Sequence, residues 1–105
     1  MIVKSEDAQQ RSFLGVDFVL LSHGSESMVA KMLYKAGDNV PFHKHPNEQS
    51  GYIISGKYRI IFNDQDQEIG PGDSYTIPRN VEHRIEIISP GEVLDVFSPP
   101  RADYI

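Results

Sequence analysis

Residues 37–56 read GDNVPFHKHPNEQSGYIISG and place two histidines, His43 and His45, two positions apart. Pro41 and Pro46 disfavour a helix here, because proline lacks the backbone N–H that a helix interior needs. In a strand, residues i and i+2 point to the same face. We therefore expect both imidazoles to point toward one position, as the ligands of a shared metal ion must.

The same segment offers two candidates for a third ligand, Glu48 and Gln49. Glutamate is the commoner metal ligand, and its charge would bind a cation more tightly. Gln49 shares the parity of the two histidines, whereas Glu48 would face the other way if the strand continued. A break at Pro46–Asn47 would upset this parity, so it favours Gln49 without excluding Glu48. Lys44 and Asn47, which flank the ligands, are expected to face outward.

A further candidate ligand, His83, lies in the segment VEHRIEI, residues 81–87, which alternates with a period of two. The face that carries His83 is otherwise apolar and is expected to point into the core. A lone histidine on such a face is more often a hydrogen-bonded core residue than a ligand. Here three of the four histidines fall in two matching contexts, which favours a ligand. The fourth, His23, lies in a turn and is interpreted as a surface residue.

These segments resemble the two signature motifs of the cupin family of small β-barrels. The first motif reads Gly, five residues, His-x-His, three or four residues, Glu, six residues, Gly. It aligns with Gly37, His43, His45, Gln49 and Gly56, so that glutamine stands at the family's glutamate position. The alignment therefore agrees with the parity argument for Gln49.

The second motif reads Gly, five residues, Pro, x, Gly, two residues, His, three residues, Asn. It aligns with Gly72, Pro78, Asn80, His83 and Ile87. Asn80 replaces a glycine, a mild change because asparagine tolerates left-handed backbone conformations. The resemblance implies an all-β fold, a small jelly-roll β-barrel, as a single domain over residues 1–105.

Length and pattern agree with this fold. A chain of 105 residues fits one domain, and it has no cysteine for disulfides or thiolate ligands. We expect strands over residues 13–21, 28–34, 52–54, 57–62, 67–69, 74–77, 81–87 and 92–97. Residues 1–12 are polar and weakly patterned, and we expect a loop or one short turn there. Tyr75 is interpreted as barrel packing that could also line a cavity.

The composition also narrows the classes of partner. The net charge is −5 and no basic run is present, which argues against nucleic acid as the main partner. No apolar run approaches the length of about 18 residues that a membrane span needs. The N-terminal sequence MIVKSEDAQQ does not resemble a signal peptide. We therefore expect a cytoplasmic protein with no membrane partner.

The C-terminal segment LDVFSPPR, residues 94–101, is the next informative part of the chain. Asp95 and Phe97 share a face of the last strand, and an inward carboxylate is costly unless it is paired or functional. Arg101 follows two prolines that could turn it back over the barrel mouth. The alternative is an edge strand with a solvated aspartate and a surface arginine.

With glutamine at the glutamate position and this tail, the chain resembles the cupins that open unsaturated uronate rings in pectin and alginate degradation. The resemblance implies one divalent metal ion held by His43, His45, Gln49 and His83. It also implies that Asp95, Phe97 and Arg101 line the site as catalytic residues. The family reaction converts unsaturated uronic acid monosaccharides, released by polysaccharide lyases, into linear ketouronates.

The residue types are consistent with that chemistry. Four neutral ligands leave the full charge on the ion, which makes it a strong Lewis acid that attracts a small anionic molecule such as a sugar acid. Arg101 suits a bidentate grip on a carboxylate. Asp95 would move a proton, and Phe97 would form an apolar wall that orients the sugar ring.

Two other functions stay open at this point. If the ion is iron, three histidines with open positions also permit a non-haem dioxygenase, and the ligand set equally suits Zn, Ni, Mn or Co. A third reading is a non-catalytic cupin that binds a sugar or another small ligand. A homodimer is expected from the resemblance and from the edge strands of a small barrel.

Overall fold

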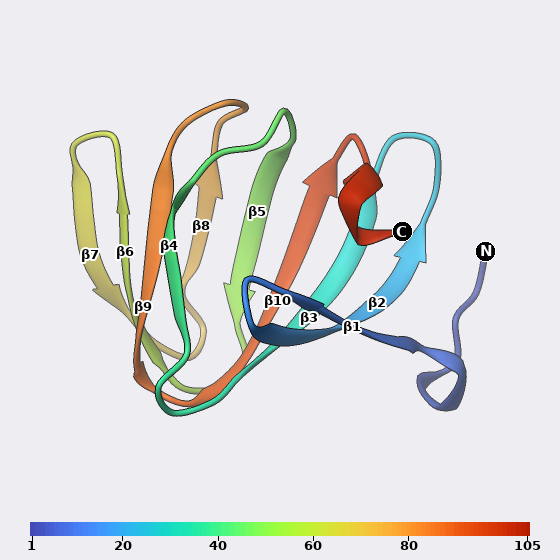
Figure 1. Ribbon diagram of the computed structural model, residues 1–105, viewed down its shortest axis with the longest axis horizontal. Coiled ribbons are helices and arrows are strands. Elements are labelled where there is room, and N and C mark those ends of the chain that lie inside the picture. Colours follow the sequence, from blue (N-terminus) through green and yellow to red (C-terminus); the bar gives the residue numbers. More distant parts are fainter.

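The computed structural model describes residues 1–105, which form ten β-strands and two single-turn 3-10 helices. The strands are arranged in two sheets that face each other (Figure 1). The six-stranded sheet has the order β1 (Gln9–Phe13), β2 (Val16–His23), β3 (Met28–Tyr34), β10 (Gly91–Ser98), β5 (Glu48–Ile53) and β8 (Ser74–Ile77). The four-stranded sheet has the order β4 (Asn39–His43), β9 (His83–Ser89), β6 (Lys57–Phe62) and β7 (Gln65–Ile69). The expected all-β jelly-roll barrel is confirmed.

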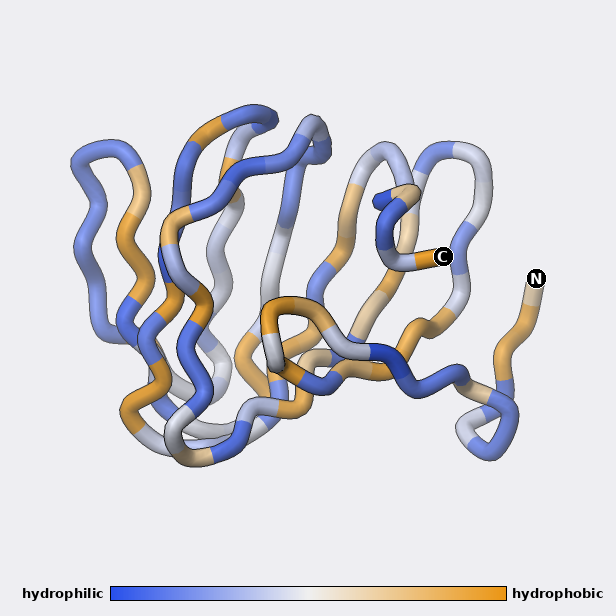
Figure 2. Tube along the Cα trace, viewed as in Figure 1, coloured by the Kyte–Doolittle hydropathy of each residue, from blue (hydrophilic) through white to orange (hydrophobic).

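Period-two alternation builds the core between the sheets. On β3 the buried residues are Met28, Ala30, Met32 and Tyr34, and the residues between them are partly exposed. Fifteen buried apolar residues form one cluster, fourteen from the two sheets and Tyr104 from the C-terminal helix η2 (Ala102–Tyr104). Figure 2 shows a hydrophobic stretch on β6 and hydrophilic residues in the connection from β4 to β5. The barrel interior is therefore apolar except where the site residues enter it.

The N-terminal region differs from the expectation of a loop. Ser5–Asp7 forms the short helix η1, but Gln9–Phe13 forms strand β1, which pairs antiparallel with β2. The first four residues of β1 are exposed, so its backbone hydrogen bonds, and not an apolar side-chain pattern, hold it in the sheet. β1 matters for the site because it places Phe13 at the barrel mouth.

The C-terminal segment returns over the same end of the barrel. After β10 the chain makes the short helix η2 (Ala102–Tyr104), and Tyr104 is buried. Figure 1 shows η2 close to the ends of β10 and β2. None of the helices is long or apolar enough to cross a membrane.

Candidate metal centre

The segment from β4 to β5 turns alternate side chains into the barrel. A register shift interrupts the β4–β9 pairing between Val40 and His43, and β4 ends at His43. Beyond this point the alternation resumes although residues 44–47 lie outside any strand. His45, Asn47 and Gln49 are buried, whereas Lys44, Pro46 and Glu48 are exposed.

The expectation that Asn47 faces outward is wrong. Asn47 has the same parity as His45 and Gln49, and only 5% of its surface is exposed. Its side-chain amide donates a hydrogen bond of 2.7 Å to the carbonyl oxygen of Pro99. Asn47 therefore connects the segment that carries His43 and His45 to the C-terminal segment. Lys44 faces outward as expected.

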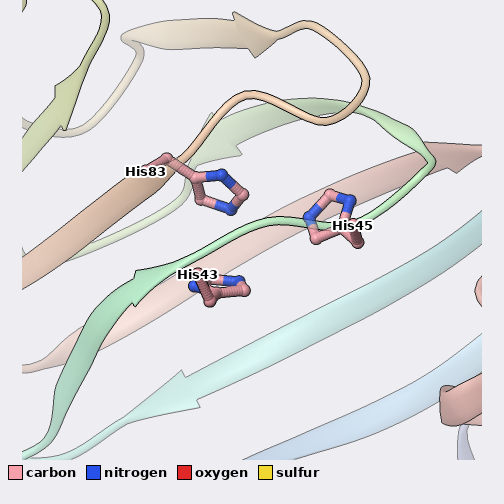
Figure 3. Close-up of side chains that lie close together, drawn as sticks. All are labelled: His43, His45 and His83. Atoms are coloured by element: carbon pink, nitrogen blue, oxygen red, sulfur yellow. The ribbon is translucent and has the colours of Figure 1, made fainter.

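Three histidines converge inside the barrel mouth, as Figure 3 shows. His83 is the first residue of β9 and pairs directly with His43 of β4. The ring centroids of His43 and His83 are 4.2 Å apart, and those of His45 and His83 are 5.0 Å apart. One ring nitrogen from each of the three lies within 4.8 Å of the others, so the group could hold a metal ion.

Backbone carbonyl groups orient all three imidazole rings. The Nδ1 atoms of His43, His45 and His83 lie 3.1, 3.0 and 2.9 Å from the carbonyl oxygens of Pro41, Asn47 and Val81. A carbonyl oxygen can only accept, so each Nδ1 carries the proton and donates it. Each Nε2 atom is left with a free lone pair, which is how metal-binding histidines are usually held.

The surroundings of two of these Nε2 atoms suit a cation. Nε2 of His83 is buried and has no hydrogen-bond partner. Nε2 of His45 lies 3.0 Å from Oε1 of Gln49, an acceptor that offers it no proton. Unpartnered buried acceptors are costly, and a cation would satisfy both. The donor set therefore fits a divalent transition metal, and the set does not select among them.

Burial keeps these histidines neutral, which metal binding requires. Burial lowers the pKa of His83 to about 4, against a hydrogen bond from Nδ1 to the Val81 carbonyl that raises it. The neighbouring histidines and Arg101 lower it further. Burial also lowers the pKa of His43 and of His45. At neutral pH the lone pairs are therefore free.

Of the two candidates for the third ligand, only Gln49 lies beside the histidines. Gln49 is 4% exposed and contacts His45, whereas Glu48 points to the outer surface. The parity argument therefore places the side chains correctly here. Gln49 lies on β5, in the sheet opposite to His43 and His83, so the group draws on both sheets.

Asp95 and Tyr75 form a polar pair deeper in the barrel. Asp95 is 2% exposed, and its Oδ1 atom accepts a hydrogen bond of 2.6 Å from the Tyr75 hydroxyl. Burial raises the pKa of Asp95 to about 6, although the hydrogen bond from Tyr75, the nearby Gln49 side chain and the charge of Arg101 oppose the shift. The sequence pattern located Asp95 on the inner face, but it did not identify Tyr75 as its partner.

Arg101 is enclosed at the barrel mouth and is only 3% exposed. Its guanidinium carbon lies 4.6, 5.2 and 4.1 Å from the ring centroids of Phe13, Phe97 and Tyr104. Nη1 donates to the Tyr104 hydroxyl, and Nε and Nη2 donate to the two carboxylate oxygens of Asp103. Arg101 does turn back over the mouth, and its bidentate edge holds an internal carboxylate.

Phe97 packs against the residues that surround Arg101. It is 1% exposed, and its ring packs edge-on against His45 and Tyr104. Phe97 lines neither of the two cavities at the site, so its contacts are with protein groups. These contacts indicate that Phe97 supports Arg101 and His45. They do not favour the expected role of Phe97 as an apolar wall against a sugar ring.

Two spaces adjoin the histidines. An outer groove of about 750 Å³ is lined by His43, His45, Lys44, Arg79, Arg101 and Asp103, among others. An inner cavity of about 10 Å³ touches His43, Gln49, His83, Asp95 and Arg101. The inner cavity is at the lower limit for one water molecule. The groove is therefore the space beside the histidines that has room for a small molecule, and Asp95 borders only the inner cavity.

Comparisons with known proteins agree with this architecture. The chain is 26% identical over 93 residues to the pectin degradation protein KdgF of Dickeya dadantii (strain 3937), covering 87% of this chain and 84% of that protein. It is 31% identical over 103 residues to the L-ectoine synthase of Rhodococcus opacus (strain B4), covering 93% and 74%. The structure of KdgF from Halomonas sp. is similar with a TM-score of 0.87 and 22% identity, covering 98% of each chain. Residues 30–97 match the family described as Cupin domain, and the chain therefore belongs to the cupin family.

Proposed function

We propose that this cupin is a metal-dependent enzyme that opens the ring of unsaturated uronate monosaccharides to give linear ketouronates. The observation that carries the proposal is the three-histidine group with an amide, and not a carboxylate, beside it. Such a neutral set suits an anionic substrate, because no ligand charge repels it. The similarity to a pectin degradation protein supports a sugar acid as the substrate class.

The substrate would bind in the outer groove. Lys44 and Arg79 line its rim, and Arg101 lies between the groove and the inner cavity. The substrate carboxylate would meet the Nε and Nη2 edge of Arg101, which already holds a carboxylate in bidentate geometry. The sugar ring would then lie beside His43 and His45.

The chemistry is an isomerisation. One proton leaves the anomeric hydroxyl, the ring C–O bond breaks, and one proton is added at the enol carbon, so no other reactant is needed. A metal ion held by His43, His45, Gln49 and His83 would supply Lewis-acid polarisation of the substrate oxygens. Asp95 would hold and return the proton through one water in the inner cavity, and its raised pKa suits both roles.

The test is a metal-dependent turnover assay on protein purified without a histidine tag. Metal content is measured by elemental analysis, and 4,5-unsaturated galacturonate and mannuronate are followed by loss of enol-ether absorbance. We expect about one ion per chain and loss of both metal and turnover in His83→Ala. His23→Ala is the matched control, because His23 lies at the end of β2 outside the histidine group. Absence of turnover in metal-loaded wild-type protein would refute the ring-opening reaction.

The same preparations separate the other functions. A dioxygenase would lose activity without oxygen, whereas ring opening continues. A binding cupin would be stabilised by a sugar acid without converting it. The 31% identity to an L-ectoine synthase makes L-ectoine formation the further reaction to assay. Each alternative keeps the histidine group as the functional centre.

A further inference from the structure

Tyr75 lies between two residues of the proposed site. Its hydroxyl is 2.6 Å from Oδ1 of Asp95 and 3.4 Å from Nε2 of Gln49. The hydroxyl has a single proton and two lone pairs. The proton is directed to Asp95, because a carboxylate can only accept. The hydroxyl oxygen is then left as an acceptor toward Gln49.

This direction determines which atom of Gln49 faces the histidines. The amide nitrogen donates to Tyr75, so the amide oxygen is the atom 3.0 Å from Nε2 of His45. The reversed amide would place its NH₂ group toward the lone pairs of the histidines and would remove an oxygen ligand from the group. The carboxylate of Asp95, acting through Tyr75, thus sets the orientation of the Gln49 amide.

A glycine makes room for this contact. Tyr75 on β8, Gly51 on β5 and Asp95 on β10 are consecutive partners across three neighbouring strands. The Tyr75 ring crosses above Gly51 to reach Asp95, and a Cβ at position 51 would overlap the ring atoms. A glycine inside a strand usually marks such a close approach. Gly51 therefore belongs to the same arrangement as Tyr75.

We propose that Tyr75 is a positioning residue, which acts through its hydroxyl to orient the Gln49 amide and to hold Asp95. Its effect on turnover rests on the proposed function. Its effect on metal affinity rests only on Gln49 being a ligand and is measured independently of any reaction. The proposal places the residue in the machinery of the site and not only in the barrel packing.

The test compares Tyr75→Phe and Gly51→Ala with two matched controls. Tyr58→Phe removes the hydroxyl of a buried tyrosine, whose bond of 2.9 Å goes to the Ser55 carbonyl outside the site. Gly24→Ala adds a methyl group at a glycine with nothing within 4 Å of the new Cβ. Metal affinity is measured by titrating the metal-free proteins with Co²⁺ and following visible absorbance. Turnover is measured with the unsaturated uronate.

We expect the dissociation constant for Co²⁺ to rise about tenfold in Tyr75→Phe, the usual effect of losing a group that orients a ligand. We expect kcat to fall at least about tenfold with KM within about twofold, because Arg101 and the groove are untouched. Gly51→Ala should have the same effects, and the double variant should lose little more than either single variant. The two controls should match wild-type protein.

The outcomes separate the two proposals. If metal-loaded wild-type protein does not convert the uronate, the proposed function fails and the Co²⁺ titration alone decides on Tyr75. A Co²⁺ dissociation constant within about twofold of wild-type in folded Tyr75→Phe overturns the positioning role. In an active enzyme, an unchanged kcat overturns it as well. An additive loss in the double variant would contradict the inference that Gly51 belongs to the same arrangement as Tyr75.

Discussion

Nε2 of His45 and Oε1 of Gln49 lie 3.0 Å apart although neither atom has a proton to donate to the other. The ring proton is on Nδ1, where it reaches the Asn47 carbonyl oxygen, and the amide protons are on the far side of Gln49. Two lone pairs at this distance repel unless a cation lies near both. A cation at this position would have Gln49 as a neutral ligand, and a charged side chain in its place would change the properties of the ion.

The Gln49→Glu variant should bind the metal more tightly and convert the uronate less efficiently. The new carboxylate adds a negative charge next to the histidines, which strengthens metal binding but weakens the Lewis acid and repels an anionic substrate. We expect the Co²⁺ dissociation constant to fall at least about tenfold and kcat/KM for the uronate to fall by a similar factor. Metal titration and initial rates check both directions, and tighter binding with full activity would show that neutrality is not required.

Asp103→Asn should improve binding of carboxylate ligands. Asp103 holds the bidentate edge of Arg101, but its side chain is 54% exposed, so the pair is worth at most about 1 kcal/mol. Removing its charge should lower KM for the uronate by up to about fivefold. Asp66→Asn is the matched control, because Asp66 makes an equivalent pair with Arg59 on the outer surface. A higher KM would mean that Asp103 helps to hold Arg101 in place.

The metal-free protein should lose stability in mild acid through His83. Its pKa is about 4 when folded and about 6.5 as the ordinary value, so the unfolded chain takes up the proton first as the pH falls. This histidine therefore lowers the free energy of unfolding between about pH 6.5 and 4, by up to about 1.4 kcal/mol per pH unit, and has no further effect below that window. Urea unfolding of wild-type and His83→Gln proteins at several pH values tests this. Equal slopes in the two proteins would contradict it.

Asn80 should be needed for its backbone conformation and for the loop that it anchors. Its φ is +61°, and its backbone N–H donates a hydrogen bond of 2.9 Å to the carbonyl oxygen of His45. Asn80→Ala should cost about 1 kcal/mol of stability and several-fold in metal affinity, whereas Asn80→Gly should cost little. Asn63 has a φ of +51° in the turn between β6 and β7, so Asn63→Ala should cost stability alone. Urea unfolding and Co²⁺ titration separate the two effects.

The outer face of the six-stranded sheet should pair with a second copy of the chain. Val96 and Tyr52 are 37% and 50% exposed, and Leu94 is the direct partner of Tyr52. An apolar sheet face of this kind is usually covered by a partner. Light scattering should give a dimer for wild-type protein and a monomer for Val96→Lys. Ile88→Lys, on the four-stranded sheet, is the control, and a monomeric wild-type protein would refute the prediction.

The sequence was sufficient where a local pattern decides the structure. Parity alone put Gln49 inside and Glu48 outside, and motif spacing brought His83 to the other histidines. Asn80 also has the left-handed conformation that its place in the second motif predicts. These features depend on neighbours in the chain, which the sequence displays directly.

The contacts that the sequence did not predict depend on tertiary packing. β1 has no apolar alternation, and only its pairing with β2 makes it a strand, so the place of Phe13 beside Arg101 had no local signal. Nothing in the sequence indicates that the Asp103 carboxylate pairs with the guanidinium of Arg101. The contact of Tyr75 with Asp95 could have been predicted only from the pairing of Tyr75 with Gly51.

The pairing of His43 with His83 also bears on how the protein folds. Two of the histidines lie close together in the chain, but His83 reaches them only when β9 pairs with β4, forty residues away by direct register. A metal ion that needs all three rings can bind tightly only after this long-range pairing has formed. In a refolding experiment started in the presence of Co²⁺, the appearance of colour would therefore time the closure of the four-stranded sheet.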